Sequence, residues 1–447
     1  MLAPGALAAQ GYGLYEQGAC AMARAGAAVA APCADGSTLV FNPAGLARMP
    51  ALVAIGGTGV LPGGTFTSTA AGRTSALERE AVISPNLYLT APMGRGVVAG
   101  LGVFNPYGLS LTWEPNSQGR FVGYRSVLRT THVQPTIAAR LGDLSLGAGV
   151  NFGFSSVRLA RRVDLAAQPT GIGTTTFAQL GVPANTDFAD VDLRASDFAV
   201  GWHAGALWQA HERVSVGARY LARQTFRYKD GRADITAIPT GVTAPADVRN
   251  PSTGAIVIPR GTPFDAVVAP QFTGSGALVD QPARTVLVTP ATAVAGIALR
   301  PTGRLMLAVD AQWTEWSVFD RVGLDFERLP REVLDQQYRD TWGWRVGAEW
   351  LLGARSMLRA GWTTNEAAAP AQSVTPVLPE AKRNAYTLGL GSQLGSRVAL
   401  DLAYMYLDQS PRAGRSVAGG VAQNDGIFRF DAHLVGVTVT YRLSGRR

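Results

Sequence analysis

The sequence predicts an all-β membrane protein, an antiparallel transmembrane β-barrel of about fourteen strands with an N-terminal hatch plugging the lumen. Three observations support this prediction. Segments with a period of two and one apolar face recur along the chain. Only 16% of the 447 residues are charged and 52 are Gly, yet the chain contains no apolar run long enough for a transmembrane helix. Short polar turns alternate with long connections, as in outer-membrane barrels.

The first element is the segment 10–50, which is rich in Ala and Gly and does not alternate like a strand. A barrel of this size encloses a lumen that its own side chains cannot fill, so we expect this segment to be the hatch. Its two cysteines, Cys20 and Cys33, could form a disulfide or serve as small buried apolar residues. Residues 1–9 end in small residues but contain no basic or apolar region, so we expect a signal-peptide remnant or a misassigned start.

The strand pattern of the barrel occupies residues 51–447. In the clearest strand, 305–316, Leu307 and Val309 share an apolar face and Asp310 lies on the other. Because charges facing lipid are costly, we expect Arg345 and Asp401 to face the lumen. The candidate strands fall near 51–60, 83–92, 96–113, 122–140, 143–161, 196–210, 213–229, 284–300, 303–319, 340–352, 355–365, 383–395, 396–408 and 430–443.

Aromatic residues near the strand ends predict a girdle at the membrane interface. The members are Trp202, Trp208, Tyr220, Trp313, Trp316, Trp342, Trp350, Tyr404 and Tyr441. Two long segments, 162–195 and 230–283, are rich in Ala, Pro, Thr and Asp and show little strand pattern. The alternation of turns places both on the extracellular side, where long loops usually carry function.

Composition also limits the function. The net charge of +8 comes from scattered Arg residues with almost no Lys, so we expect no nucleic acid. The positive charge indicates either contact with outer-membrane lipid and lipopolysaccharide or solubility charge without a specific partner. No G-x-S-x-G elbow or metal-binding cluster occurs. We therefore expect no enzyme activity, no catalytic residue, no metal and no cofactor. A secreted soluble β-protein, a general porin and an outer-membrane lipid-modifying enzyme are the alternatives.

Several short motifs, spread over nearly the whole chain, carry a family resemblance: Asn42-Pro43-Ala44 and the segments 100–109, 201–205, 313–317 and 432–437. Through them the chain resembles the FadL/TodX family of Gram-negative outer-membrane transporters. The resemblance implies a monomer that passively takes up a hydrophobic small molecule, either a long-chain fatty acid or an aromatic or aliphatic hydrocarbon. It also implies a lumenal apolar pocket and a lateral exit at a kinked third strand.

The resemblance assigns the lateral gate to Pro106, Tyr107 and Gly108 at the kink and to the hatch tripeptide Asn42, Pro43 and Ala44 beside it. The residues agree with this assignment, since Pro106 cannot donate a ladder hydrogen bond and Gly108 has no side chain to pack. An ordinary turn at Pro106-Tyr107-Gly108 is the alternative.

The resemblance also implies a ligand site formed by Tyr12, Asn105, Val157, Leu159 and Arg161. Arg161 would pair a substrate carboxylate bidentately, or it is an exposed arginine at the base of a loop. The family's second basic residue corresponds to a position near Gly323 in this sequence. Either Arg321 or Arg328 replaces that residue, or the ligand is neutral.

Overall fold

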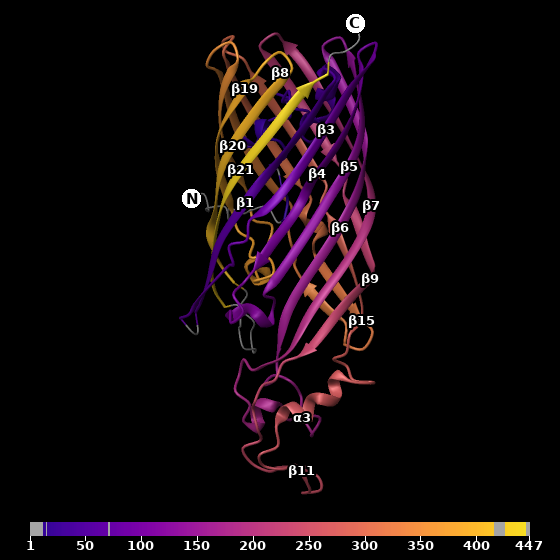
Figure 1. The fold of residues 1–447 in the computed structure, drawn as a ribbon, viewed down its shortest axis with the longest axis vertical. Helices are drawn as coiled ribbons and strands as arrows, with labels where there is room; N and C mark the ends of the chain where they lie inside the picture. The colour runs from indigo at the N-terminus through magenta and orange to yellow at the C-terminus, as the bar shows by residue number, and fades with distance from the viewer. Residues whose placement is uncertain (1–11, 15, 70–71, 415–424, 444–447) are drawn as a thin grey trace, which may run out of the picture.

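The computed structural model describes residues 12–14, 16–69, 72–414 and 425–443 of the chain. The chain forms a closed fourteen-stranded antiparallel β-barrel with a small N-terminal helical region inside it, which confirms the predicted fold class (Figure 1). Residues 1–9, the predicted signal-peptide remnant, lie outside the described residues.

Some strands of the barrel wall are continuous and others are interrupted. The wall consists of β1 (Leu52–Ser68), β3 (Val82–Gly94), β4 (Val97–Thr112), β5 (Arg125–Leu141), β6 (Leu144–Asp164), β7 (Asp187–His211), β8 (Val214–Leu221) with β9 (Gln224–Ala237), β12 (Gln281–Thr289) with β13 (Thr292–Leu299), β14 (Leu305–Thr314) with β15 (Arg321–Phe326), β16 (Glu332–Asp335) with β17 (Thr341–Leu351), β18 (Ser356–Asn365), β19 (Arg383–Gln393), β20 (Val398–Ala413) and β21 (Gly426–Arg442).

The barrel closes where β21 pairs with β1, from Leu52 opposite Arg442 to Ser68 opposite Gly426. Short turns such as 142–143 and 394–397 lie at the end of the barrel at which β21 ends (Figure 1). The long connections lie at the opposite end. They contain β2 (Thr74–Ala76), η2 (Gln118–Phe121), η3 (Phe177–Leu180), β10 (Val248–Arg249), β11 (Ile256–Ile258), α3 (Phe264–Val268), η4 (Ala269–Phe272) and η6 (Ala371–Ser373). The short helix η5 (Trp316–Val318) lies instead within the interruption between β14 and β15.

The strands alternate between a lipid-facing and a lumen-facing side, as their period of two requires. In β14, Leu307 and Val309 are exposed on the outer face, whereas Asp310 is buried in the lumen. Arg345 and Asp401 are buried there too, as predicted. The prediction that Trp316 belongs to the aromatic girdle at the membrane interface is wrong. Because β14 ends at Thr314, η5 turns the chain inward and buries the Trp316 ring completely.

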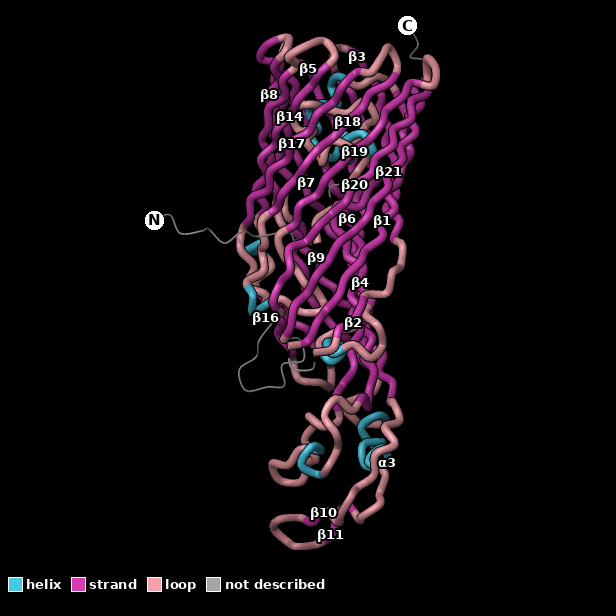
Figure 2. Tube along the Cα trace, turned by 90° about the vertical axis from the view of Figure 1, so that its left-hand side faces the viewer, coloured by secondary structure: helices cyan, strands magenta, loops and turns pink. Residues whose placement is uncertain are grey.

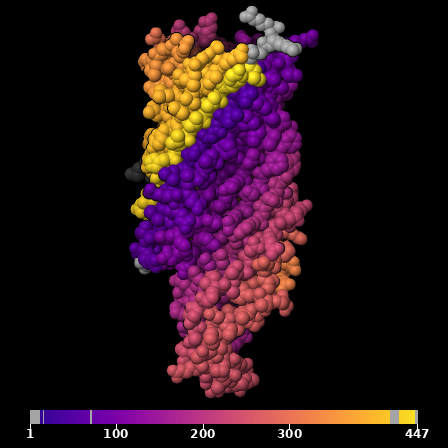
Figure 3. Space-filling model, viewed as in Figure 1, coloured from indigo at the N-terminus to yellow at the C-terminus, as the bar shows by residue number. Residues whose placement is uncertain are grey.

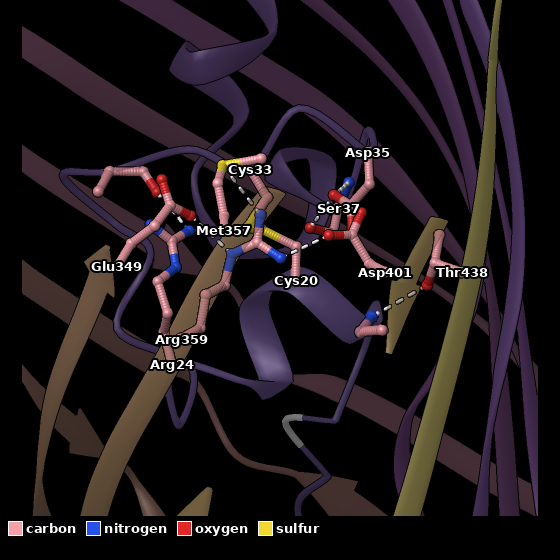
Figure 4. Close-up of a disulfide and its surroundings, with 12 residues drawn as sticks. Cys20, Arg24, Cys33, Asp35, Ser37, Glu349, Met357, Arg359, Asp401 and Thr438 are labelled. Atoms are coloured by element: carbon pink, nitrogen blue, oxygen red, sulfur yellow. Dashed lines mark hydrogen bonds and ion pairs between the residues drawn. A yellow bond between two sulfur atoms is a disulfide. The ribbon is translucent and has the colours of Figure 1, made fainter. Parts of the chain in front are cut away.

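The hatch lies inside the barrel and contains α1 (Ala19–Met22), α2 (Thr38–Phe41) and η1 (Pro43–Arg48). Cys20 and Cys33 form a disulfide, with their Cα atoms 6.1 Å apart, so the first of the two alternatives for these cysteines holds (Figure 4). Nearly every hatch side chain is buried. No described helix is long and apolar enough to cross a membrane.

Lumen-facing polar side chains hold the hatch backbone in place. The Asp310 carboxylate on β14 accepts hydrogen bonds from the backbone N–H groups of Ala28 and Val29, at 2.9 and 3.0 Å. The Ser215 hydroxyl on β8 donates to the carbonyl oxygen of Ala30 at 2.8 Å. The Thr438 hydroxyl on β21 accepts from the Ala19 N–H at 2.9 Å (Figure 4). These groups satisfy backbone atoms that the hatch, with its little regular structure, cannot pair internally.

The two long segments of the sequence contain more strand than predicted. β6 continues to Asp164, β7 starts at Asp187, and β9 continues to Ala237. Their outward faces carry salt bridges, such as Arg194 with Asp192 at 2.7 Å, so they lack the apolar alternation of a lipid-facing strand. Residues 165–186 and 238–280 fold together beyond the barrel end as a cap module (Figures 2 and 3). The core of the cap module includes Leu165, Phe177, Val182, Ile258 and Phe264.

Candidate functional site

The barrel wall is interrupted between β3 and β4. These strands pair from Gly94 opposite Val97 to Leu87 opposite Val103, and the described pairing stops there. Beyond that point β3 remains paired with β1 on its other edge, and β4 remains paired with β5. The two strands therefore part and leave an opening in an otherwise closed sheet.

The irregular part of β4 lies at this opening. Its register with β5 shifts between Phe104 and Tyr107, so that Asn105 and Pro106 form a bulge opposite Thr131. A proline at this place has no N–H to donate to a neighbouring strand. The bulge bends β4 away from β3, and it coincides with the segment at which the family resemblance implied a kink.

The N-terminal segment of the hatch occupies part of the opening. The Leu14 N–H donates to the carbonyl oxygen of Pro106 at 2.8 Å, and the Gly108 N–H donates to that of Tyr12 at 2.9 Å. Gly13 forms an antiparallel bridge with Tyr107. A Cβ atom on Gly108 would lie 2.8 Å from Leu14 Cδ1, so glycine at this position allows the close approach. We call the described residues 12–14, 16 and 17 the edge segment.

An open pocket of about 800 Å³ extends from this opening into the barrel. At its outer end lie Ile55 and Ile83, which are exposed on the lipid-facing surface. At its inner end lie Arg383 and the buried side chain of Leu434. The pocket therefore passes through the wall between β3 and β4. Its lining is mainly apolar and includes Val60, Leu109, Leu111, Leu128, Leu378 and Phe430.

Asn105 links three elements at the opening. Its side-chain oxygen accepts from the Thr131 hydroxyl on β5 at 2.8 Å, and its side-chain nitrogen lies 3.3 Å from the Ser84 hydroxyl on β3. Its backbone carbonyl accepts from the Gln17 side chain of the edge segment. Asn105 lines the pocket, and its contact with Ser84 is a polar link across the interruption.

Tyr12 lies in an aromatic cluster of the lumen. Its ring centroid is 4.9 Å from that of Trp316, 5.6 Å from Phe319 and 6.0 Å from Tyr107, each in an edge-to-face arrangement. Such pairs add stability beyond the area they bury. Tyr338 packs on Phe319 at 4.9 Å. Of the rings in this cluster, the sequence predicts only Tyr12 and Tyr107 as site residues, because strand alternation does not show that η5 folds into the lumen.

The structure does not bring Val157, Leu159 and Arg161 to this pocket. All three face inward on β6, but Val157 packs near Phe226, and Leu159 packs in a separate apolar cluster. The Arg161 guanidinium forms a salt bridge with Glu332, with an N–O distance of 2.8 Å. A protein carboxylate therefore already occupies the place where a substrate carboxylate was expected.

The hatch tripeptide also lies away from the pocket lining. The Asn42 side chain donates to the carbonyl oxygens of Val29, at 2.7 Å, and of Ala206 on β7, at 2.9 Å. A Cβ atom on Gly205 would lie 2.3 Å from the Asn42 side-chain oxygen. Asn42, Pro43 and Ala44 thus pack against β6 and β7, where wall glycines make room for them.

A buried acidic residue lies next to the pocket. Glu380, in the loop 366–382, accepts from the N–H groups of Ala368 and Ala369 at 3.1 and 3.0 Å. Burial raises the pKa of the Glu380 carboxyl, although these N–H groups and the nearby Arg383 and Arg412 oppose that shift. No described group of three or more His, Cys, Asp or Glu residues could hold a metal ion.

The fold and this opening define a class of protein, a membrane β-barrel with an internal hatch and a lateral interruption in its wall. The sequence profile of the family described as outer membrane protein transport protein (OMPP1/FadL/TodX) matches residues 1–443, and the chain belongs to this family. It is accordingly a protein of the Gram-negative outer membrane.

Individual relatives are distant in sequence. An outer membrane protein of Neisseria meningitidis is 23% identical over 97% of this chain and 95% of its own length. Outer membrane protein P1 of Haemophilus influenzae is 23% identical over 72% of this chain and 65% of its own length. Both are named as proteins of the outer membrane.

Two solved structures show the same fold. A FadL homologue of Pseudomonas aeruginosa superposes with a TM-score of 0.79 at 20% identity, covering 97% of this chain and 100% of its own. The toluene transporter TodX of Pseudomonas putida gives a TM-score of 0.70 at 16% identity, with coverage of 97% and 100%. At sequence identities of 20% and 16%, the structural similarity establishes the fold alone.

Proposed function

We propose that this protein is a passive transporter that takes up hydrophobic molecules into the outer membrane through the opening between β3 and β4. The observation that carries the proposal is the apolar pocket that joins the lumen to the lipid-facing residues Ile55 and Ile83. A molecule in this pocket reaches the hydrocarbon of the membrane without crossing the hatch. Transport of toluene by the structurally similar TodX supports a hydrophobic substrate.

The edge segment serves as the gate in this proposal, and the hatch body serves as the fixed plug. The segment is held to β4 by a few backbone hydrogen bonds, each of which contributes only about 0.5–1.5 kcal/mol net. The disulfide and the wall contacts of Ala28 and Val29 hold the hatch body. Asn42, Pro43 and Ala44 act in gating by fixing that body against β6 and β7. No chemical step, cofactor or energy source takes part.

A cysteine pair across the interruption tests the lateral route. Ser84→Cys with Asn105→Cys replaces two side chains whose polar atoms lie 3.3 Å apart. Oxidation should link β3 to β4 and reduce the uptake of dodecanoate and toluene to the background of cells that lack the protein. The same double variant, alkylated before oxidation, should transport both compounds.

The matched control is Leu89→Cys with Leu101→Cys, because these residues already face each other in the β3–β4 ladder. Its cross-link should leave uptake unchanged. Unchanged uptake in the cross-linked Ser84/Asn105 variant would rule out the lateral route.

We also propose that the protein acts as a monomer surrounded by outer-membrane lipid and lipopolysaccharide. Its strand edges are paired around the barrel except at the opening. The sheet therefore presents few unpaired edges to which a strand of a partner chain could add. Arg158 and Arg194 face outward beyond the exposed rings of Phe154 and Phe198, at the level expected for lipid headgroups. The mass of the complex in mild detergent and its phosphate content test both statements.

A further inference from the structure

The turns at the short-turn end of the barrel share one feature, an exposed arginine. This end faces the periplasm when the long connections are extracellular. All six of its turns between described strands contain at least one such residue: Arg95, Arg140, Arg213, Arg300 with Arg304, Arg355 and Arg397. Arg48 of the hatch and Arg442 of β21 are half-buried at the same end. We call these nine residues the rim arginines.

The rim arginines are not neutralised by carboxylates. None of them forms a salt bridge with a described residue. In the six turns, which span 93–96, 140–143, 209–213, 300–304, 352–356 and 394–397, the acidic residues are Asp143 and Glu212 alone. The opposite end carries charges of both signs, several of them joined in salt bridges, such as Arg232 with Asp234 at 2.7 Å. The short-turn end therefore holds an excess of positive charge.

Three of the rim arginines act on one another. The Arg48 guanidinium donates to the Gln209 side-chain oxygen at 2.8 Å and to the carbonyl oxygen of Asp143 at 3.3 Å, so it reaches from the hatch to two of the turns. Burial lowers the pKa of Arg48, and the charges of Arg140 and Arg300 also lower it, whereas the charge of Asp143 opposes them. An anion bound near these arginines would relieve their mutual repulsion.

The rim arginines lie at the edge of the lipid-facing surface. A large, exposed apolar residue continues the outward face of a strand to the end of the barrel at six places: Met93, Leu141, Leu299, Leu352, Leu394 and Leu443. Each of them lies within three residues of a rim arginine in the sequence. At such a boundary an arginine lays its carbon stem along the hydrocarbon and holds its guanidinium among the headgroups.

We propose that the rim arginines bind the headgroups of acidic phospholipids, such as phosphatidylglycerol, in the periplasmic leaflet of the outer membrane. This leaflet consists of phospholipids, whereas lipopolysaccharide lies in the outer one. A guanidinium pairs a phosphate through parallel N–H donors, and each basic residue near an anionic bilayer adds to the attraction. Because the arginines follow lipid-facing side chains all around the barrel, a shell of lipid reaches them better than an acidic protein docked on the periplasmic face. The inference does not depend on transport.

The test measures how strongly the full-length protein prefers spin-labelled phosphatidylglycerol over spin-labelled phosphatidylcholine in vesicles of dioleoylphosphatidylcholine. The wild type should select phosphatidylglycerol, and the preference should shrink as the ionic strength rises. A rim variant combines Arg140→Gln, Arg300→Gln, Arg355→Gln and Arg397→Gln. It should lose about half of the preference, since four of the seven exposed turn arginines are gone. The same four changes to Lys should retain it, because the attraction depends on the positive charge.

The matched control combines Arg223→Gln, Arg232→Gln, Arg321→Gln and Arg331→Gln, which are exposed arginines toward the opposite end. It removes the same charge and should keep the wild-type preference. An equal loss in both variants would overturn the inference, because the total charge and not the rim would then be responsible. A loss in the Lys variant as large as in the Gln variant would overturn it too. No preference in the wild type would reject acidic lipid and favour an acidic protein. Uptake of dodecanoate by the rim variant should be unchanged, which separates this inference from the proposed transport.

Discussion

The backbone N–H of Gly108 donates a hydrogen bond to the carbonyl oxygen of Tyr12, 2.9 Å away. Through this bond and its neighbour from Leu14 to Pro106, the edge segment takes the place along β4 that β3 leaves open. At the opening, a short segment of the hatch thus pairs with β4 in place of a barrel strand, through a few backbone hydrogen bonds.

We expect Gly108→Val to displace the edge segment. The new side chain would start 2.8 Å from Leu14 Cδ1, and such overpacking typically costs about 1–3 kcal/mol. Amide hydrogen exchange at Leu14 should therefore become faster, while exchange in β5 stays slow. Gly59→Val in β1 is the control, because the nearest atom to a Cβ there is the Val435 carbonyl oxygen at 3.9 Å. Equal protection of Leu14 in both variants would contradict this role of Gly108.

We expect Asp310→Ala to loosen the hatch body. The substitution removes the acceptor of two buried N–H groups, on Ala28 and Val29, and each buried unpaired donor costs about 1–3 kcal/mol. The variant should show frequent open-channel events in planar bilayers, where the wild type should stay closed. Asp310→Asn keeps an acceptor oxygen and should lie between the two. A closed Asp310→Ala channel would show that other wall contacts suffice to fix the hatch.

We expect loss of the disulfide to expose the hatch to proteases and to leave the barrel intact. The bond between Cys20 and Cys33 closes a loop with a sequence separation of 13, and a crosslink over such a loop stabilises by about 3 kcal/mol. The variant Cys20→Ala with Cys33→Ala should be cleaved within 20–33 under conditions in which the wild type resists. Circular dichroism should show the same strand content in both. Equal resistance would mean that burial alone protects this loop.

The sequence predicted the barrel well because its signal is local. Alternation in β14 depends only on neighbouring residues, and it placed Leu307, Val309 and Asp310 on their observed faces. The charges Arg345 and Asp401 followed from the cost of facing lipid. The strand extensions in β6, β7 and β9 were missed, because salt bridges across strands, such as that of Arg158 with Asp192, replace the apolar pattern there.

The site was harder to predict because it depends on contacts between distant residues. Arg161 and Glu332 are far apart in sequence, and only the closed barrel brings them together. For Arg383, the alternation of 383–393 predicts that the side chain faces inward. The sequence does not show which side chains surround it in the barrel, and among the described residues it hydrogen-bonds Gln409 and forms no salt bridge. The inward turn of Trp316 depends on where β14 ends, and strand ends are the least certain part of such a prediction.

The cap module should open at acid pH through Asp265. Burial by itself raises the pKa of this carboxyl, but hydrogen bonds from the Thr240 hydroxyl and N–H and from the Gly241 N–H outweigh it, and the pKa is lowered. A carboxyl whose pKa is lower in the folded state than in the unfolded state stabilises the fold above its unfolded pKa. That contribution is lost as the pH falls through the folded pKa. Amide exchange at Thr240 and Gly241, corrected for the intrinsic rate, should therefore be slow near neutral pH and fast below the folded pKa. Asp265→Asn should exchange fast at both values, because an amide offers a single acceptor oxygen where the carboxylate has two. If wild-type protection did not change with pH, Asp265 would not hold this loop.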